Sequence, residues 1–315
     1  MDEPLFLAPI FHEKLWGGQK LKTKFNLQSP FEKTGEAWMI SAHKDGCCVV
    51  KNGLYANQRL DLVWEKYPHL FGYPQEEKFP LLVKLIDAQD DLSVQVHPDD
   101  AYAWEHEGES GKTECWYILE ATDSAVIIYG HYAQTKKEFI SKIEEGEWDT
   151  LLKRVPVVKG EFYYVPSGMV HAIGKGCLII EVQQSSNSTY RLYDYNRKNE
   201  KGELRDLHIK QSLDVVKIPS ADSKVVCGEQ ISSGIVSLLS GAYFKVDKVC
   251  VDKEIHISRG ESPYQLVTVM EGSGSLLIGS NRYGLIAGDS FIIPNSILEW
   301  MAEGELELLI AGCQG

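Results

Sequence analysis

The sequence predicts a mainly β fold that consists of two related β-barrels with short helical insertions. Three observations support this prediction. Short segments rich in β-branched and aromatic residues follow one another along the chain, and Gly, Pro, Asn or Asp separates nearly all of them. A motif in residues 160–171 recurs in residues 288–299. Helical periodicity is confined to two stretches.

The predicted strands occur in both halves of the chain, a distribution typical of antiparallel sandwiches and barrels. Residues 264–279 also predict a hairpin with Gly272 and Gly274 at its turn. The strand segments are residues 47–50, 80–88, 93–98, 114–121, 125–130, 161–166 and 177–184 in the first half, and 234–251, 264–272, 273–279, 289–295 and 306–311 in the second.

The two helical insertions are predicted from the spacing of apolar residues. Residues 56–72 place Leu60 and Val63 at helical spacing, and residues 135–155 show the same pattern from Phe139 onward. Both stretches interrupt the run of strands, so we expect two short helical insertions there.

The repeat divides the chain into two related halves. GEFYYVPSGMVH (160–171) and GDSFIIPNSILE (288–299) share the spacing Gly-x5-Pro-x4-polar, which describes a tight turn, a strand, a proline corner and a second strand. The last residue is His171 in the first copy and Glu299 in the second. We therefore expect a first barrel with a histidine-based site in residues 1–218, and a degenerate second barrel without metal in residues 219–315.

Composition excludes several classes of partner. The 315-residue chain has a net charge of −13, which argues against nucleic acid or an anionic membrane as the main partner, because both attract basic surfaces.

The cysteines and the start of the chain predict the location of the protein. The seven cysteines are odd in number, form no CxxC pair and sit mostly in apolar runs, which predicts reduced thiols in a cytoplasmic protein. The acidic start predicts no signal peptide, and no apolar run is long enough to predict a membrane span.

A group of ligand-type residues stands on the predicted strands of the first half. Gln95 and His97 are two residues apart and therefore point to the same face of a strand. Glu114 opens a second strand, and His171 opens a later one. Each residue alone is usually structural, but neighbouring strands can bring all four to one ion. A mixed N/O set without thiolate suits a catalytic Zn²⁺ and would also accept Mn²⁺ or Fe²⁺.

The motifs carry a family resemblance. Residues 160–171 fit the second cupin motif, Gly-x5-Pro-x-Gly-x2-His, except for its final Asn. The resemblance to type I mannose-6-phosphate isomerases covers about residues 10 to 197 and implies a cupin, or jelly-roll, fold. It also implies one zinc ion per chain, bound by Gln95, His97, Glu114 and His171. The segments that resemble this family are EKLWGG (13–18), GEAWMIS (35–41), SVQVHP (93–98), GKTE (111–114) and VPSGMVHAI (165–173).

Further residues match the family's active site. The resemblance implies catalytic roles for Glu181, Lys112 and Arg191, and substrate binding by Lys84, Lys112 and Arg191. Glu181 interrupts an apolar run, where an unpaired carboxylate is costly, and an arginine fork suits a phosphate or an enediolate. Ser93 shares the strand face of Gln95 and is a further candidate for substrate binding.

One position departs from the family pattern. Many relatives have His-Lys-Pro-Glu where this chain has Gly111-Lys112-Thr113-Glu114, so a histidine that could help open the sugar ring is missing. Asp194, Tyr195 or solvent could take that role. The choice of catalytic base between Glu181 and Lys112 also stays open.

The resemblance implies the interconversion of mannose 6-phosphate and fructose 6-phosphate through a cis-enediol, with a small sugar phosphate as the partner and no redox cofactor. Two alternatives are a non-catalytic sugar-binding cupin and a non-haem iron dioxygenase. The complete ligand set argues against the first, and Gln95 in a ligand position is unusual for the second. The sequence does not predict the oligomeric state.

Overall fold

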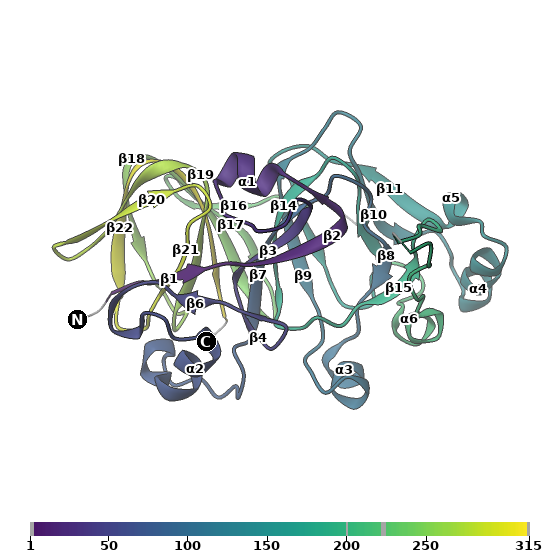
Figure 1. Ribbon diagram of the computed structural model, residues 1–315, viewed down its shortest axis with the longest axis horizontal. Coiled ribbons are helices and arrows are strands. Elements are labelled where there is room, and N and C mark those ends of the chain that lie inside the picture. Colours follow the sequence, from purple (N-terminus) through teal and green to yellow (C-terminus); the bar gives the residue numbers. More distant parts are fainter. Residues whose placement is uncertain (1–2, 200, 222–224, 314–315) are drawn as a thin grey trace.

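The computed structural model describes residues 3–199, 201–221 and 225–313. Three large β-sheets form successive layers, and most helices lie at the periphery (Figure 1). The predicted mainly β class is confirmed. In the described part of the chain the strands are hydrogen-bonded into open sheets rather than closed barrels. A further small sheet pairs β4 (Ala42–His43) with β5 (Gly46–Cys47).

The five-stranded sheet forms one outer layer. Its outer face is apolar and packs under α4 (Lys136–Glu144), α5 (Trp148–Leu151) and α6 (Ile209–Val215). Val94 and Val96 belong to this face, so Gln95 between them points to the inner face. The sheet has the order β11–β10–β13–β8–β15 and contains β8 (Val94–Val96), β10 (Val126–His131), β11 (Leu152–Pro156), β13 (His171–Ile173) and β15 (Tyr190–Tyr193).

The six-stranded sheet is the central layer and is buried on both faces. In β14, Ile179 packs toward the five-stranded sheet, whereas Leu178, Ile180 and Val182 pack toward the other neighbour. This double burial explains why its strands are so rich in apolar residues. The sheet has the order β12–β9–β14–β7–β3–β2 and contains β2 (Ile10–Gly18), β3 (Thr34–Ile40), β7 (Leu81–Asp87), β9 (Glu114–Glu120), β12 (Phe162–Val165) and β14 (Leu178–Gln184).

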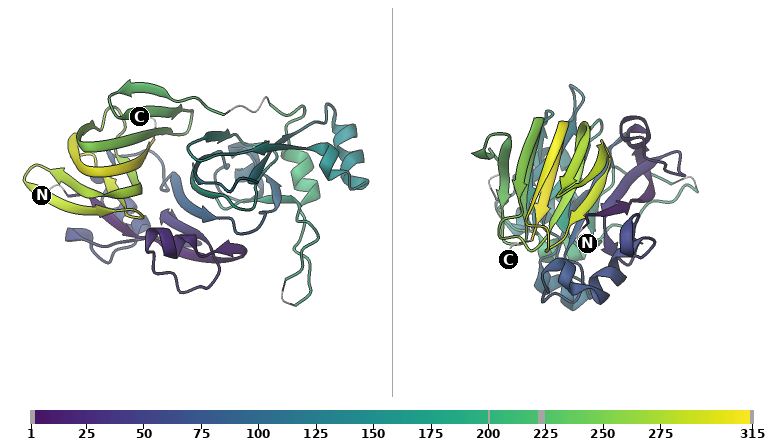
Figure 2. Two further views of the ribbon diagram at one scale, coloured as in Figure 1. Left: turned by 90° about the horizontal axis from the view of Figure 1, so that it is seen from above. Right: turned by 90° about the vertical axis from the view of Figure 1, so that its left-hand side faces the viewer.

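The nine-stranded sheet contains strands from both ends of the chain, and the right panel of Figure 2 shows its C-terminal strands side by side. Leu5 of β1 pairs with Ile292 of β21, so the first strand of the chain belongs to the C-terminal sheet. The boundary at residue 218 stays a prediction. The strands are β1 (Leu5–Ala8), β6 (Val49–Val50), β16 (Glu229–Ser232), β17 (Ile235–Ser240), β18 (Lys245–Ser258), β19 (Gln265–Ile278), β20 (Asn281–Ile286), β21 (Ser290–Ile293) and β22 (Glu299–Gly312).

The two predicted helical insertions are present, and further helices were missed. Residues 56–72 form α2 (Leu60–Lys66) and the 3-10 turn η2 (Pro68–Phe71), while residues 135–155 contain α4 and α5. Helices α1 (Lys20–Phe25), α3 (Asp100–His106) and α6, and the 3-10 turn η1 (Gly53–Tyr55), had no predicted counterpart. Within the described residues, no helix is long and apolar enough to cross a membrane.

The predicted hairpin turn at Gly272 and Gly274 is wrong. Both glycines lie inside the continuous strand β19, and the chain reverses between β19 and β20 instead. A Cβ atom at Gly272 would lie 1.9 Å from the carbonyl oxygen of Glu305, and one at Gly274 would lie 2.0 Å from that of Glu303. The glycines therefore permit close approach to β22 rather than a turn.

The repeat predicted from the sequence occupies equivalent places in the two halves. The first copy forms β12, a proline corner and the start of β13 at His171. The second copy forms β21, a proline corner and the start of β22 at Glu299. His171 is buried, whereas Glu299 is exposed. The same local structure thus presents a buried imidazole in one half and a surface carboxylate in the other.

Candidate metal centre

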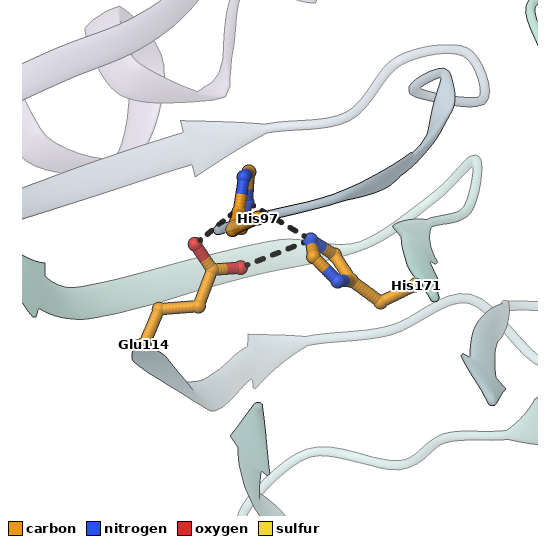
Figure 3. Close-up of side chains that lie close together, drawn as sticks. All are labelled: His97, Glu114 and His171. Atoms are coloured by element: carbon orange, nitrogen blue, oxygen red, sulfur yellow. Dashed lines mark hydrogen bonds and ion pairs between the residues drawn. The ribbon is translucent and has the colours of Figure 1, made fainter. Parts of the chain in front are cut away.

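Three ligand-type side chains converge between the five-stranded and six-stranded sheets (Figure 3). His97 follows β8 directly, Glu114 opens β9 and His171 opens β13, and all three are buried. The two histidine Nε2 atoms are 3.1 Å apart. Glu114 Oε2 lies 3.3 Å from His97 Nε2, and Glu114 Oε1 lies 3.4 Å from His171 Nε2.

The hydrogen bonds of His171 determine which nitrogen carries its proton. Nδ1 lies 2.8 Å from the carbonyl oxygen of Met169, which can only accept. Burial lowers the pKa of His171, so the neutral ring is favoured. The proton therefore resides on Nδ1, and Nε2 presents its lone pair to the cluster.

His97 presents a second lone pair. Its Nε2 lies 3.0 Å from Lys112 Nζ, and a lysine ammonium can only donate. Burial, helped by the charge of Lys112, lowers the pKa of His97 to about 3. The two Nε2 atoms are therefore both acceptors, although they face each other at hydrogen-bonding distance.

Glu114 adds a negative charge to these two acceptors. Burial alone would raise its pKa, but Lys112 together with His97 and His171 outweighs burial and holds the pKa well below its ordinary value. Lys112 Nζ lies 2.9 Å from Glu114 Oε2. The Lys112 ammonium pairs with His97 and Glu114, but the lone pair of His171 still faces that of His97 at 3.1 Å, and a further cation among these ligand atoms would relieve their repulsion. The residues therefore fit a divalent metal ion with N and O ligands.

Gln95 reaches the cluster from the five-stranded sheet, and Arg191 stands opposite Gln95 on the neighbouring strand. Gln95 is the cross-strand partner of both His171 and Arg191, and its Nε2 lies 3.4 Å from His171 Nε2. A flip of the amide would turn its oxygen toward the cluster instead. The Arg191 side chain is half-buried, and its guanidinium donates to the carbonyl oxygen of Asp206 at 2.8 Å.

A lateral row of side chains in the six-stranded sheet borders the cluster. Trp116, Glu181, Lys84 and Trp38 are cross-strand partners on the neighbouring strands β9, β14, β7 and β3. Lys84 Nζ lies 3.2 Å from Glu181 Oε1 and 5.3 Å from the centre of a Trp38 ring. Burial and the charge of Glu114 raise the pKa of Glu181, which makes this carboxylate a stronger base than an exposed one.

The structure thus brings most of the predicted residues together. Lys112 contacts two of the three clustered side chains, and Lys84 pairs with Glu181. Ser93 is buried but precedes β8, at the opposite end of this strand from His97. Its predicted contact with substrate stays a prediction.

Sequence reasoning missed the tryptophans of the row. Trp116 stands two residues after Glu114 and therefore shares its face of β9. A buried indole N–H normally requires an acceptor, so the Glu-x-Trp spacing was the available signal. The pairing of β9 with β14, which brings Glu181 to the same indole, was not readable from the sequence.

A polar cavity of about 420 Å³ lies next to Tyr190 and His208, and its lining includes none of the clustered side chains. Its lining includes Glu109, Tyr190 and His208, and the last two flank Arg191, whose backbone N–H donates to His208 Nδ1. Glu109 accepts a hydrogen bond from Ser188 and lies 3.2 Å from a ring nitrogen of His43. The cavity is large enough for a small polar molecule.

Comparison with known proteins identifies the family. The model of the phosphomannose isomerase type I catalytic domain matches residues 5–120, and that of the mannose-6-phosphate isomerase cupin domain matches residues 235–311. Mannose-6-phosphate isomerases of Streptococcus mutans and Bacillus subtilis are both 47% identical to this chain, with 98% of each chain covered. A crystal structure of the Bacillus subtilis mannose 6-phosphate isomerase superimposes with a TM-score of 0.94 at 40% identity and 99% coverage of both chains. A putative mannosephosphate isomerase from Archaeoglobus fulgidus, at 22% identity and a TM-score of 0.77, shares the fold. Because such relatives match nearly its entire length, the chain belongs to the type I phosphomannose isomerase family.

Proposed function

We propose that this chain interconverts mannose 6-phosphate and fructose 6-phosphate through a cis-enediol, with one divalent metal ion that His97, Glu114, His171 and Gln95 hold. One observation carries the proposal: His97, Glu114 and His171 are buried, and their ligand atoms all lie within 4.8 Å of one another. Family membership gives the sugar phosphate as the substrate class. Zinc is the first candidate metal, because the ligand set combines N and O donors without thiolate.

The metal and the protein side chains have separate tasks in this proposal. A bound divalent ion would polarise the sugar oxygens and stabilise negative charge that develops on them. Glu181 is the candidate base for the proton next to the carbonyl, because its buried carboxylate has a raised pKa. Lys84 Nζ, 3.2 Å from Glu181, orients that carboxylate.

Lys112 and Arg191 supply positive charge at the site. Lys112 is buried beside Glu114 and His97, from where its ammonium can donate a hydrogen bond to a substrate oxygen. Arg191 lies across from Gln95, where its planar fork can bind the phosphate or the enediolate.

Two broader assignments belong to the same proposal. The division into a catalytic half, residues 1–218, and a half without metal, residues 219–315, is supported by the buried His171 and the exposed Glu299 at equivalent positions. A cytoplasmic location is supported by the cysteines, all seven of which are free thiols.

The first test follows the formation of fructose 6-phosphate from mannose 6-phosphate. Activity should disappear after treatment with a chelator and return with Zn²⁺. His97→Ala and His171→Ala should each leave less than about 1% of the activity, because even the outer partners of metal ligands are worth roughly 10–100-fold. Metal analysis of the purified protein should find about one zinc per chain.

The exposed His256 provides the matched control. His256→Ala should retain both the activity and the metal. Full activity in His97→Ala or His171→Ala would overturn the ligand assignment. Bound iron together with oxygen consumption, and no isomerisation, would instead indicate an oxygenase.

A further inference from the structure

We infer that Trp116 is a positioning residue of the metal centre: its indole N–H bridges Glu114 and Glu181 and fixes both carboxylates. The inference rests on the proposed function, in which Glu114 binds the metal and Glu181 is the base. It begins from two distances. Trp116 Nε1 lies 3.1 Å from Glu114 Oε1 and 2.9 Å from Glu181 Oε2.

The bridge belongs to a longer chain of contacts that crosses the site. Lys84 lies 3.2 Å from one oxygen of Glu181, and the indole holds the other oxygen. The same indole holds one oxygen of Glu114, and Lys112 lies 2.9 Å from the second. Each carboxylate is therefore held on both sides, and Trp116 is the only member that contacts both.

The chemistry of indole suits this position. Indole has one N–H donor and no acceptor, so it can stand between two carboxylates without adding a charge or a competing ligand. A lysine there would add a third ammonium next to the proposed metal, and a histidine would bring another ligand nitrogen. Trp116 is also completely buried, which gives its hydrogen bonds a fixed geometry.

Trp116 also contacts a second proposed ligand. Its ring meets the ring of His171 edge-on, with 5.5 Å between centroids and 68° between planes. Behind it the ring packs in the core between the two sheets, near Ile118 and Ile179. Because the core fixes the position of the ring, the ring in turn restricts the positions of Glu114, Glu181 and His171.

Trp116→Phe tests the inference, because it keeps the aromatic ring and removes the N–H. Competition with a chelator of known affinity should show Zn²⁺ binding weakened by roughly tenfold, the size typical for partners of metal ligands. With saturating Zn²⁺, kcat should fall by about tenfold or more while KM changes little, because the residues proposed to bind substrate are untouched.

Trp38→Phe is the matched control. Trp38 stands in the same lateral row, and its Nε1 donates to Glu36 at 2.8 Å rather than to a proposed metal ligand. This variant should bind Zn²⁺ as tightly as the unaltered protein. A full-length protein with 3-benzothienylalanine in place of Trp116 keeps the shape of the ring and replaces the N–H by sulfur, so it should lose the same Zn²⁺ affinity as Trp116→Phe.

Each outcome supports or overturns the inference. Zn²⁺ affinity and kcat in Trp116→Phe equal to those of the unaltered protein would overturn it, as would an equal loss of Zn²⁺ affinity in Trp38→Phe. If Trp116→Phe does not fold, the benzothienylalanine protein takes its place in the chelator competition, and Zn²⁺ affinity equal to that of the unaltered protein would then overturn the inference. Absence of isomerase activity in the unaltered, Zn²⁺-loaded protein would refute the proposed function instead. The Zn²⁺ affinities of the variants do not depend on that activity, so the two failures can be distinguished.

Discussion

Glu36 illustrates how the six-stranded sheet keeps a charged side chain inside the fold. Burial alone would raise its pKa, but Lys14, Lys84 and the hydrogen bond from Trp38 outweigh burial and lower the pKa to about 2. Lys14 Nζ lies 3.1 Å from Glu36 Oε1. A carboxyl whose pKa is lowered by folding stabilises the protein above its ordinary pKa and loses that contribution as the pH falls toward the folded value.

Glu36→Gln should therefore flatten the pH dependence of stability in acid. In the unaltered protein this residue contributes up to about 3 kcal/mol near neutral pH, which is lost between about pH 5 and pH 2. The variant should show a smaller fall in the free energy of unfolding over that range. Urea unfolding of the metal-free proteins at several pH values measures this difference, with the exposed Glu105→Gln as the matched control. Parallel curves for Glu36→Gln and the unaltered protein would contradict the assignment.

Individual residues of the site differed in how far the sequence could predict them. The alternation around Gln95 and the repeat that ends at His171 are local patterns, so each residue could be identified as a candidate. That the two residues meet, through the pairing of β8 with β13, was expected from the family resemblance. Arg191 lies opposite Gln95 as a binding role requires, yet its guanidinium bonds to Asp206. That contact depends on the return of the chain near residue 206, for which the sequence contains no periodic signal.

An aromatic cluster attaches the helical insertion to the nine-stranded sheet. The ring of Phe71 in η2 lies 4.8 Å from that of Trp64 in α2 and 5.4 Å from that of Tyr264, which directly precedes β19. Phe71 is completely buried. The short helix α2 therefore depends on tertiary packing rather than on its own propensity.

Phe71→Ala should destabilise the protein by about 3–5 kcal/mol, because it leaves a cavity within this cluster. Urea denaturation at neutral pH provides the measurement. Leu54 in the neighbouring turn η1 is 80% exposed, so Leu54→Ala should change stability by less than about 0.5 kcal/mol. A loss in Phe71→Ala no larger than that of Leu54→Ala would show that the cluster does not anchor the insertion.

Secondary structure was predictable where a pattern was long enough. The apolar spacing near α2 and α4 located both insertions. Helices α3 and α6 are as long as α2, with seven residues each, but α2 buries three apolar residues whereas α3 buries only Ala103 and α6 only Ser212, so neither has a fully buried apolar stripe. Asp99, whose side chain accepts from the backbone N–H of Tyr102 at 3.0 Å, is a capping residue at the start of α3 that the prediction did not use. The glycines of β19 were misassigned because a close approach to β22 and a turn use the same residue type.

At the scale of the whole molecule, the two halves share a core. Val83 and Val182 lie on the face of the six-stranded sheet that packs against the nine-stranded sheet, and they belong to the same cluster as Val246 and Leu309 of that sheet. Strands β1 and β6, from the start of the chain, complete that second sheet. The repeat predicted two similar halves, but it contained no information on this exchange of strands, because pairing between distant segments leaves no local pattern.

This shared core predicts that the first half does not fold alone. A fragment of residues 1–218 would leave β1 without β21. It would also expose to water the apolar face of the six-stranded sheet that otherwise packs against the nine-stranded sheet. We expect it to aggregate or to unfold without a cooperative thermal transition. Co-expression with residues 219–315 should yield a soluble complex that binds Zn²⁺ and isomerises mannose 6-phosphate, because the missing strands and the apolar partner surface are then restored. A soluble 1–218 fragment with a cooperative transition and bound zinc would show instead that the catalytic half is an independent domain, and that the strands it shares with the second sheet contribute little to its stability.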